Sequence, residues 1–560
     1  MPMHFPSFFD AYLELLEQKG INISVPLTDF IINLPSFPLT IMLEELLQKE
    51  SDHVKTFGIA GIVSLAIFYF LIYPLYLNPL CKVPGPKICA LSKFWILYKS
   101  WSEQRNHYVD ELHKKYGPIV RIGPNEVDIS DSDYLNEVFI RDMEKSKFYS
   151  QFVNYNSHNT FSTIDKVGHR QSRKVTTRFY SKTHVCTDEV QDYIRGIMSK
   201  LLKIMDEYKT KPINTFILWS DMAMDAITIF SFGTKYYQSV LDDPFGLGKE
   251  IVMEFFTQSS SWFWDTQLPS LRKLVVPKSV DIAAQKCYDW IEAQFNKSLG
   301  GIGDSQQTLV NTVLGEKAQS SPKPVFDKGR AKSECFDHIA AGHNTTATTL
   351  SYVYFSLARN PEVQKKLIEE LKQFNGGKYL ASDDYNSQIY AQIENLPYLN
   401  AVVDETLRVY SAIPGQEPRV APKGGMIWRG SKETPKCIIP QGTVITIQPW
   451  SIHRNKDVFT DPNHWNPDRW MIDDEEKLKV MHKNLIPFSA GARMCIGKNL
   501  ALCEIKMNIS NMMSRYRVKL QNDFDYDKYS YFADMYTSVP ACGQMPLIYE
   551  PLLDPIKSKE

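Results

Sequence analysis

Apolar residues recur every three to four positions along most of the chain, which is the spacing of amphipathic helices. This pattern predicts long helices at 188–208, 215–232, 328–358, 361–374 and 396–411. Runs with the composition of strands are short and lie at 119–122, 126–129 and 443–447. The expected fold is therefore mainly α-helical with small β-sheets.

One apolar stretch lacks the polar face of the other helices. TFGIAGIVSLAIFYFLIYPLYL, residues 56–77, contains no charged side chain, and about 20 apolar residues suffice to cross a hydrocarbon core ~30 Å thick. A buried core helix is the alternative, but such helices usually keep a polar face. The stretch begins too far into the chain for an ordinary signal peptide. It predicts a single N-terminal transmembrane helix.

This helix divides the chain into four parts. Residues 1–55 are an N-terminal extension, 56–77 the anchor, 78–90 a hinge that contains Pro-Gly-Pro, and 91–560 one large domain. Within the extension, the apolar residues at 30–43 are interrupted by two prolines and are too few for a second span. Lysines concentrate after the anchor, so the positive-inside rule predicts a lumenal extension and a cytosolic domain.

Charge and cysteine spacing argue against several classes of protein. Sixty-three Lys and Arg residues face 64 Asp and Glu residues, which gives a net charge of −1, so we expect no nucleic-acid partner. The nine cysteines contain no CxxC pair, which argues against a structural zinc site and favours a reducing compartment. Neither an HExxH zinc helix nor a GxSxG nucleophile turn occurs.

One cysteine is placed as a ligand, in the stretch PFSAGARMCIGKNLA. Cys495 precedes a predicted helix start, where free N–H groups and the helix dipole stabilise a thiolate. Gly491 permits a sharp turn, and Gly497 lets the backbone approach a flat macrocycle. Arg493 offers a planar fork to a propionate, and Phe488 can shield the sulfur from water. The arrangement suits haem iron held by a thiolate.

These residues complete the motif FxxGxRxCxG, and from about Lys82 onward the chain resembles cytochrome P450, the haem-thiolate monooxygenases, in their microsomal fungal form. The stretch ELHKKYGPIVRIGPNEVDIS also resembles fungal members of that family. The resemblance implies the P450 fold for 91–560. It further implies haem b, iron protoporphyrin IX, as cofactor, with Cys495 as the axial ligand of the iron.

A second family motif, ExxR, is present in NAVVDETLRVYSAIP as Glu405 and Arg408. Residues three apart on a helix share a face and can pair. The resemblance implies Arg469, in HWNPDRW, as the third member of a structural triad. Apolar neighbours on the helix favour a buried pair over a surface bridge, because a lone buried charge would be costly.

A third motif, AAGHNTTATTL, lies within the predicted helix 328–358. Ala341, Gly342 and Thr345 match the family pattern, in which small residues leave room for oxygen and the threonine hydroxyl can open the helix. The family's acid is replaced by Asn344, which has no proton to give near neutral pH. We take Thr345 and Asn344 as the catalytic candidates.

The remaining site residues follow from the resemblance alone. His169 and Arg173, in DKVGHRQSRKV, match the family's WxxxR helix with histidine in place of tryptophan, and they are expected to contact haem propionates together with Arg419 and, less securely, Arg454. By the same analogy an apolar pocket would contact substrate through Phe148, Phe152, Phe161, Ala341, Ile413 and Val539. Ordinary packing explains the aromatic residues equally well.

The sequence therefore predicts a monooxygenase that inserts one oxygen atom of O2 into a lipophilic small molecule at the endoplasmic reticulum membrane. The chain has no flavin or nicotinamide fingerprint, so electrons should come from NADPH through cytochrome P450 reductase, with cytochrome b5 as a further partner. Two alternatives stay open. One is a haem-thiolate isomerase, dehydratase or desaturase, and the other is a non-catalytic haem-binding membrane protein.

Overall fold

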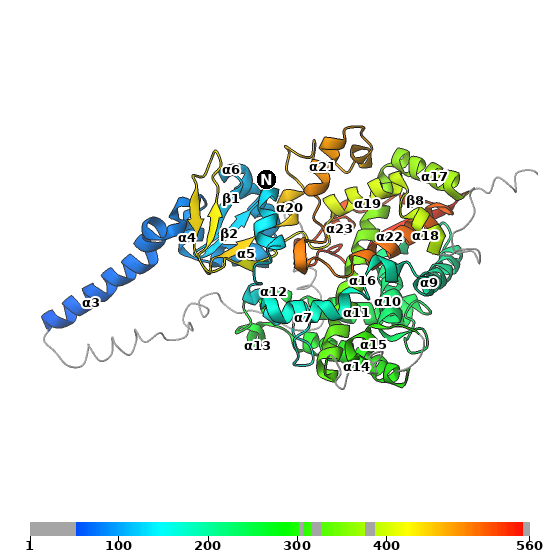
Figure 1. The fold of residues 1–560 in the computed structure, drawn as a ribbon, viewed down its shortest axis with the longest axis horizontal. Coiled ribbons are helices and arrows are strands. Elements are labelled where there is room, and N and C mark those ends of the chain that lie inside the picture. The colour runs from blue at the N-terminus through cyan, green and yellow to red at the C-terminus, as the bar shows by residue number, and fades with distance from the viewer. Residues whose placement is uncertain (1–51, 302–305, 316–325, 376–386, 553–560) are drawn as a thin grey trace, which may run out of the picture.

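The computed structural model describes residues 52–301, 306–315, 326–375 and 387–552. The predicted mainly α-helical body with small sheets is confirmed (Figure 1). All five predicted long helices are present, as α9 (Asp188–Glu207), α10 (Thr215–Phe232), α16 (Lys328–Arg359), α17 (Pro361–Asn375) and α19 (Pro397–Val409). The predictions for the lumenal extension and for 30–43 lie outside the described residues.

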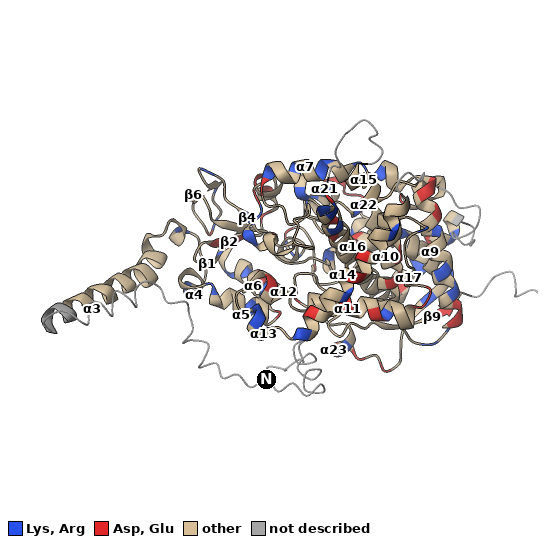
Figure 2. Cartoon of the chain, turned by 90° about the horizontal axis from the view of Figure 1, so that it is seen from below, with Lys and Arg blue, Asp and Glu red and all other residues tan. Residues whose placement is uncertain are grey.

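An apolar helix projects from the body at the N-terminal side (Figures 1 and 2). It comprises α3 (Asp52–Ile67) and the π-helical η2 (Phe68–Leu77), which contains Pro74. Phe57–Leu77 has a mean hydropathy of 2.1 and buries none of its residues in the body. The other apolar helix, α10, has a mean hydropathy of 1.2 and is wholly buried, so its apolar character is explained by the core.

The chain between the anchor and the body is held against strand β1 (Ile119–Gly123). Arg121 donates from Nη1 to the carbonyl of Pro74 at 2.7 Å, and its backbone N–H donates to the carbonyl of Pro84 at 2.8 Å. A Cβ on Gly85 would lie 2.4 Å from the carbonyl oxygen of Arg121. The Pro-Gly-Pro stretch therefore packs against β1, and only glycine fits at its central position.

Three small sheets accompany the helices. The first has the order β1-β2-β7-β4, with β2 (Glu126–Ile129) parallel to β7 (Val444–Thr446) and both other pairs antiparallel, including β4 (Arg419–Val420). The second pairs β5 (Met426–Trp428) with β6 (Cys437–Ile439), and the third has the order β3 (Ile213–Asn214), β9 (Pro546–Pro551), β8 (Tyr516–Leu520). The first sheet has its own apolar core, which includes Ile119, Val127 and Ile445.

The larger core is helical and centres on α16, which packs along α10. The rings of Trp219 and Tyr354 join the two helices, with centroids 5.1 Å apart. A Cβ on Gly342 would lie 3.0 Å from Cγ1 of Ile227 on α10. The small size of Gly342 therefore serves helix packing, and its expected role in leaving room for oxygen stays a prediction.

The other helices surround this pair. Those of the N-terminal half are α4 (Lys87–Leu91), α5 (Phe94–Trp101), α6 (Arg105–Tyr116), α7 (Lys166–Thr177), α8 (Lys182–Val185), α11 (Lys249–Ser259), α12 (Trp262–Thr266), α13 (Arg272–Val275) and α14 (Lys278–Ser298). Those of the C-terminal half are α15 (Leu309–Leu314), α18 (Ser387–Ile393), α20 (Pro449–Ile452), α21 (Glu475–Lys483), α22 (Lys498–Met513) and α23 (Tyr526–Tyr529). The short turns η3 (Pro79–Lys82), η4 (Ser132–Tyr134), η5 (Asn136–Ile140), η6 (Lys147–Gln151), η7 (Pro244–Gly248), η8 (Leu299–Gly301), η9 (Pro467–Trp470) and η10 (Gly491–Arg493) connect them.

Candidate active site

Cys495 lies in the loop that leads into α22, and α22 packs against α16. Burial raises the pKa of the Cys495 thiol, whereas the backbone N–H groups of Gly497 and Lys498 and the guanidinium of Arg173 favour the thiolate. A metal ion at the sulfur would complete the deprotonation, since a coordinating thiol loses its proton outright. The helix start predicted from the sequence is therefore present, with its N–H groups directed at the sulfur.

The two glycines of this loop have different functions. Gly491 has a φ of +73°, and a Cβ there would lie 2.2 Å from the carbonyl oxygen of Phe139, so conformation and space both require glycine. A Cβ on Gly497 would lie 3.9 Å from Sγ of Cys495, in ordinary contact. Gly497 thus keeps the surface beside the sulfur open. Phe488 accepts the Cys495 N–H through its carbonyl at 2.9 Å.

Solvent-accessible residues on α16 fall into two rows, although the helix is central in the body. Asp337, Ala341 and Thr345 recur at intervals of four, so they share one face. Cys495 is accessible as well, despite its position in the interior. An internal space therefore borders the helix over these two turns. The Thr345 hydroxyl donates to the Ala341 carbonyl at 2.8 Å, as expected for a threonine that loosens a helix.

Asn344 belongs to the other row and lies on a different side of α16 from Thr345. It lines a pocket of about 40 Å³ between α10, α11 and α16, together with Ser220, Ala340 and His343. This volume holds one or more water molecules, since a water needs roughly 10–15 Å³. His343 donates from Nδ1 to the Ile339 carbonyl, and burial lowers its pKa to about 4. Asn344 therefore contacts a polar pocket behind the helix.

A cluster of cations is buried beside this space. His169 on α7 is 3% exposed, Arg419 2%, Lys145 4% and Arg493 8%. Burial lowers the pKa of Lys145 well below its usual range, and Arg419 and Arg493 lower it further. Burial, with Arg493, Lys145 and Arg173 as positive neighbours, lowers the pKa of His169 to about 3. The charged forms of these groups are costly to bury, so an anionic partner would stabilise them.

Few acids are available to this cluster. Nε of Arg493 donates to Asp142 at 2.7 Å. The two Nη atoms of Arg493 donate to the carbonyls of Thr163 and Ile164. Arg419 donates to the Tyr149 hydroxyl at 3.1 Å, and its Nη2 lies 3.7 Å from a carboxylate oxygen of Glu417. Lys145 donates to the Phe161 carbonyl at 2.6 Å, and among the described residues no carboxylate forms a salt bridge with it. The cluster suits a ligand that brings its own carboxylates.

Arg454, the less secure candidate, is placed differently. Its guanidinium lies 3.4 Å from the centroid of the Trp450 ring and donates to the carbonyl of Val409. Burial lowers its pKa to about 9. These contacts describe a structural residue, separate from the cation cluster.

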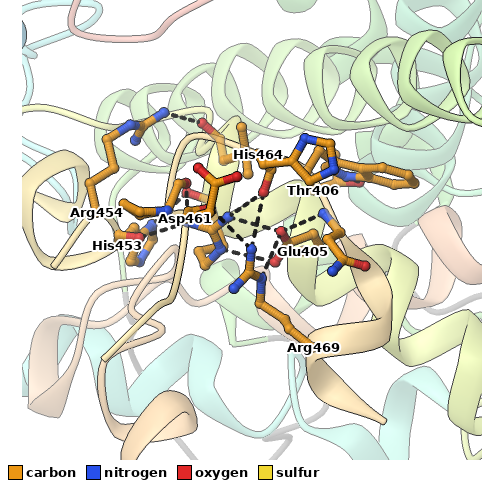
Figure 3. Close-up of polar contacts among 12 residues, drawn as sticks. Glu405, Thr406, His453, Arg454, Asp461, His464 and Arg469 are labelled. Carbon is orange, nitrogen blue, oxygen red and sulfur yellow. Dashed lines mark hydrogen bonds and ion pairs between the residues drawn. The ribbon is translucent and has the colours of Figure 1, made fainter. Parts of the chain in front are cut away.

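The structure brings the three residues of the predicted triad together, and Figure 3 shows Arg469 beside Glu405. Both Nε and Nη2 of Arg408 donate to the carboxylate of Glu405, at 2.9 and 2.8 Å, and Nε of Arg469 donates to it at 3.0 Å. Trp470 Nε1 and the backbone N–H of Asn466 also donate to Glu405. Glu405 and Arg408 are completely buried. The carboxylate is thus satisfied by five donors.

The aromatic residues of the predicted substrate pocket contact one another. Ring centroids lie 5.6 Å apart for Phe148 and Phe152, and 5.2 Å for Phe152 and Phe161, and Tyr536 contacts the first two. Phe152, Phe161, Tyr536 and Ile413 are half-buried, so they border accessible space. Val539 is 2% exposed and packs in the main core. The structure therefore places Val539 away from open space.

Comparison with known families decides what this site belongs to. The family model for cytochrome P450 matches residues 83–530. The chain belongs to the cytochrome P450 family. A P450 uses a haem-thiolate cofactor and O2, and it works with a redox partner and a small-molecule substrate.

Fungal P450s are among the relatives of this chain. The cytochrome P450 monooxygenase oblB of Cochliobolus heterostrophus is 29% identical over 497 residues, or 81% of this chain and 88% of that protein. The monooxygenase phqM of Penicillium fellutanum is 29% identical, covering 79% and 82%. The fusicoccadiene C-8 hydroxylase of Alternaria brassicicola is 27% identical, covering 79% and 85%. This P450 is therefore a haem-dependent monooxygenase, and the alternatives without oxygen insertion are not favoured.

The residues present fit haem b. Cys495 offers the thiolate, and the buried cations around Lys145 offer partners for two propionates. Lys145 is the residue that sequence reasoning missed, because it lies in no motif and its neighbours Arg419 and Arg493 are distant in the sequence. The fork of Arg493, predicted to bind a propionate, already binds Asp142 and two carbonyls.

Proposed function

We propose that this P450 is anchored in the endoplasmic reticulum membrane and inserts one oxygen atom of O2 into a lipophilic small molecule. NADPH–cytochrome P450 reductase supplies the electrons, with cytochrome b5 as a further donor. The observation that carries the proposal is the Cys495 sulfur facing the N–H groups of α22 beside the accessible face of α16. The apolar walls formed by Phe152 and Phe161 support a lipophilic substrate.

Each side chain has a defined task in this proposal. Haem b, bound through Cys495, supplies the iron at which O2 is activated. Lys145, Arg173 and Arg419 would neutralise the propionates and His169 would hydrogen-bond to them, whereas the guanidinium of Arg493 stays on Asp142 and two carbonyls. The Thr345 hydroxyl exchanges its helix hydrogen bond for one to water and moves a proton toward the site. Asn344 orients water in the pocket behind α16, where its amide can both donate and accept.

We propose the same four parts as the sequence predicts. They are an extension at 1–55, an anchor at 56–77, a hinge at 78–90 and a monooxygenase domain at 91–560. The exposed apolar surface of Phe57–Leu77 supports the anchor. The contacts of Arg121 with Pro74 and Pro84 support a stiff hinge. A stiff joint fixes the orientation of the site relative to the bilayer.

The experiment that tests the function follows isotopically labelled O2 into product. Full-length protein in microsomes is incubated with reductase, NADPH and a panel of lipophilic compounds, and products are analysed by mass spectrometry. A product that carries one labelled oxygen atom and requires NADPH supports the proposal. Products that form without labelled oxygen would favour the isomerase, dehydratase or desaturase alternatives.

Thr345→Ala should uncouple the enzyme, because the hydroxyl that relays protons is lost. We expect product per NADPH to fall by about tenfold or more, with peroxide released instead. Thr349→Ala is the matched control, since Thr349 bonds the Thr345 carbonyl one turn further along α16 but is buried. Asn344→Asp should preserve or improve coupling. Unchanged product per NADPH in Thr345→Ala would place the proton relay elsewhere.

Membrane topology predicts which asparagine is glycosylated. Asn22 lies in the sequon Asn-Ile-Ser of the extension, and Asn296 lies in Asn-Lys-Ser on the exposed surface of α14. With a lumenal extension, Asn22 should be modified and Asn296 should not. A mobility shift removed by glycosidase and by Asn22→Gln would support this topology. Glycosylation of Asn296 would instead indicate that the large domain lies in the lumen.

A further inference from the structure

One carboxylate on the accessible face of α16 has no partner. Asp337 lies two turns before Thr345 on the same row, and no hydrogen bond or salt bridge reaches its carboxylate from the described residues. Its neighbour Glu334 differs, because it accepts from the Thr160 N–H at 2.8 Å and pairs with His338 at 3.3 Å. Since a carboxylate in the interior is costly without a partner, a ligand that offers Asp337 a partner would gain binding energy there.

The carboxylate of Asp337 lies near one member of a group of aromatic rings. Its charge acts on Tyr536, which contacts Phe148 and Phe152, and the ring of Phe152 contacts that of Phe161. Burial raises the pKa of Asp337 to about 7, against the opposing charges of His338 and Lys145. The environment therefore combines aromatic rings with the titratable neighbours Glu334, His338 and Lys145, and Asp337 is only partly ionised near neutral pH.

Lys145 does not neutralise Asp337. Its Nζ donates to the Phe161 carbonyl and lies 4.2 and 4.1 Å from the ring centroids of Tyr149 and Phe161. Arg419 and Arg493 act on Lys145 more strongly than Asp337 and Glu417 do, so Lys145 belongs to the propionate cluster and forms no salt bridge with Asp337 among the described residues. Asp337 is left facing the space that Ala341 and Thr345 border.

We propose that Asp337 is the polar anchor of the substrate pocket and that the substrate carries a protonated nitrogen. This inference rests on the proposed function of the same site. A cation satisfies the charge of the carboxylate, and the faces of aromatic rings stabilise it further. A hydroxyl would make one hydrogen bond and leave the charge unbalanced. Eight residues of helix span about 12 Å, so the nitrogen and the oxidised carbon lie at opposite ends of an elongated apolar molecule.

The test compares three probes of equal chain length on the haem-loaded, full-length protein. N,N-dimethyldecylamine is cationic at neutral pH, and decanol and decanoate are its neutral and anionic counterparts. Binding is measured from the spectral change that follows displacement of water from the haem iron. We expect the amine to bind about tenfold or more tightly than decanol, as a charge-assisted contact allows, and decanoate to bind weakest.

Variants assign the preference to Asp337. Asp337→Asn should remove the amine preference and leave decanol binding unchanged, and Asp337→Glu should restore it in part. Asp337→Ser repeats the test if the amide variant loads haem poorly. Asp192→Asn is the control, because Asp192 is an exposed acid on α9. Equal binding of amine and decanol to the native protein, or a preference that survives in Asp337→Asn, would overturn the inference.

The two proposals fail differently. Absence of the haem-thiolate spectrum in the native protein would overturn the proposed function. A normal spectrum with oxygen inserted into decanol, but without an amine preference, would overturn only the assignment of Asp337.

Discussion

Replacing Cys495 by alanine should abolish both the red-shifted Soret band of the reduced, carbon-monoxide-bound P450 and its monooxygenase activity. Haem iron in this site has one thiolate ligand, and alanine offers none. The N–H groups of Gly497 and Lys498 would then face a methyl group, so the loop also loses the negative charge that it is built to stabilise. Difference spectra of microsomes that express each variant measure the effect.

Cys503→Ala is the matched control. Cys503 lies eight residues later on α22, completely buried, and accepts from Nε2 of Gln191 at 3.3 Å. Burial raises the pKa of its thiol to about 12, so it stays protonated and acts as a small apolar group. The variant should keep the Soret band with a modest loss of stability. An unchanged spectrum in Cys495→Ala would end the haem-thiolate interpretation.

The long helices could be predicted because their periodic apolar faces are set by local sequence. The helix α10, which contains Asp221 and Asp225, shows the limit of that argument, because length and mean hydropathy alone do not separate it from the anchor Phe57–Leu77. The neighbours of each helix separate the two. The helix α10 is enclosed by α9, α11 and α16, whereas no residue of the anchor is buried against the body. Burial is a property of the assembled fold.

The Cys495 loop was predictable for a different reason. Its turn, helix start and ligand lie within ten residues, so their relation is fixed by spacing. Lys145 was not predictable as a functional residue, nor was the lack of a partner for Asp337, because their environments combine segments far apart in the sequence. The same holds for Asn344, whose side of α16 is decided by how the helix packs on α10 and α11.

Glu405→Ala and Arg408→Ala should each give little or no haem-loaded protein. Removal of one partner from a buried ion pair costs about 3–5 kcal/mol. Glu405→Ala would leave Arg408, Arg469 and the Trp470 N–H without their acceptor. Haem content per protein, measured after purification, reports the effect.

Arg408 also connects the triad to the cysteine loop. It donates to the carbonyls of His453, Pro462 and His464, and its own carbonyl accepts from Nδ1 of His453. Nε2 of His453 accepts the N–H of Ile486, two residues before Phe488. Burial lowers the pKa of His453 to about 3, so the ring is neutral and can accept there. The loss of Arg408 should therefore disturb the loop that holds Cys495.

Two controls separate this network from an ordinary salt bridge. Lys479→Ala breaks an exposed pair with Glu476 that has the same i,i+3 spacing on α21, and exposed pairs contribute about 0–1 kcal/mol. It should load haem normally. Arg469→Ala should have an intermediate effect, because Arg469 is at the edge of the network and Glu405 keeps Arg408. Normal haem content in both Glu405→Ala and Arg408→Ala would mean that the pair contributes no more than a surface bridge, and that the cysteine loop is positioned by its own turn at Gly491.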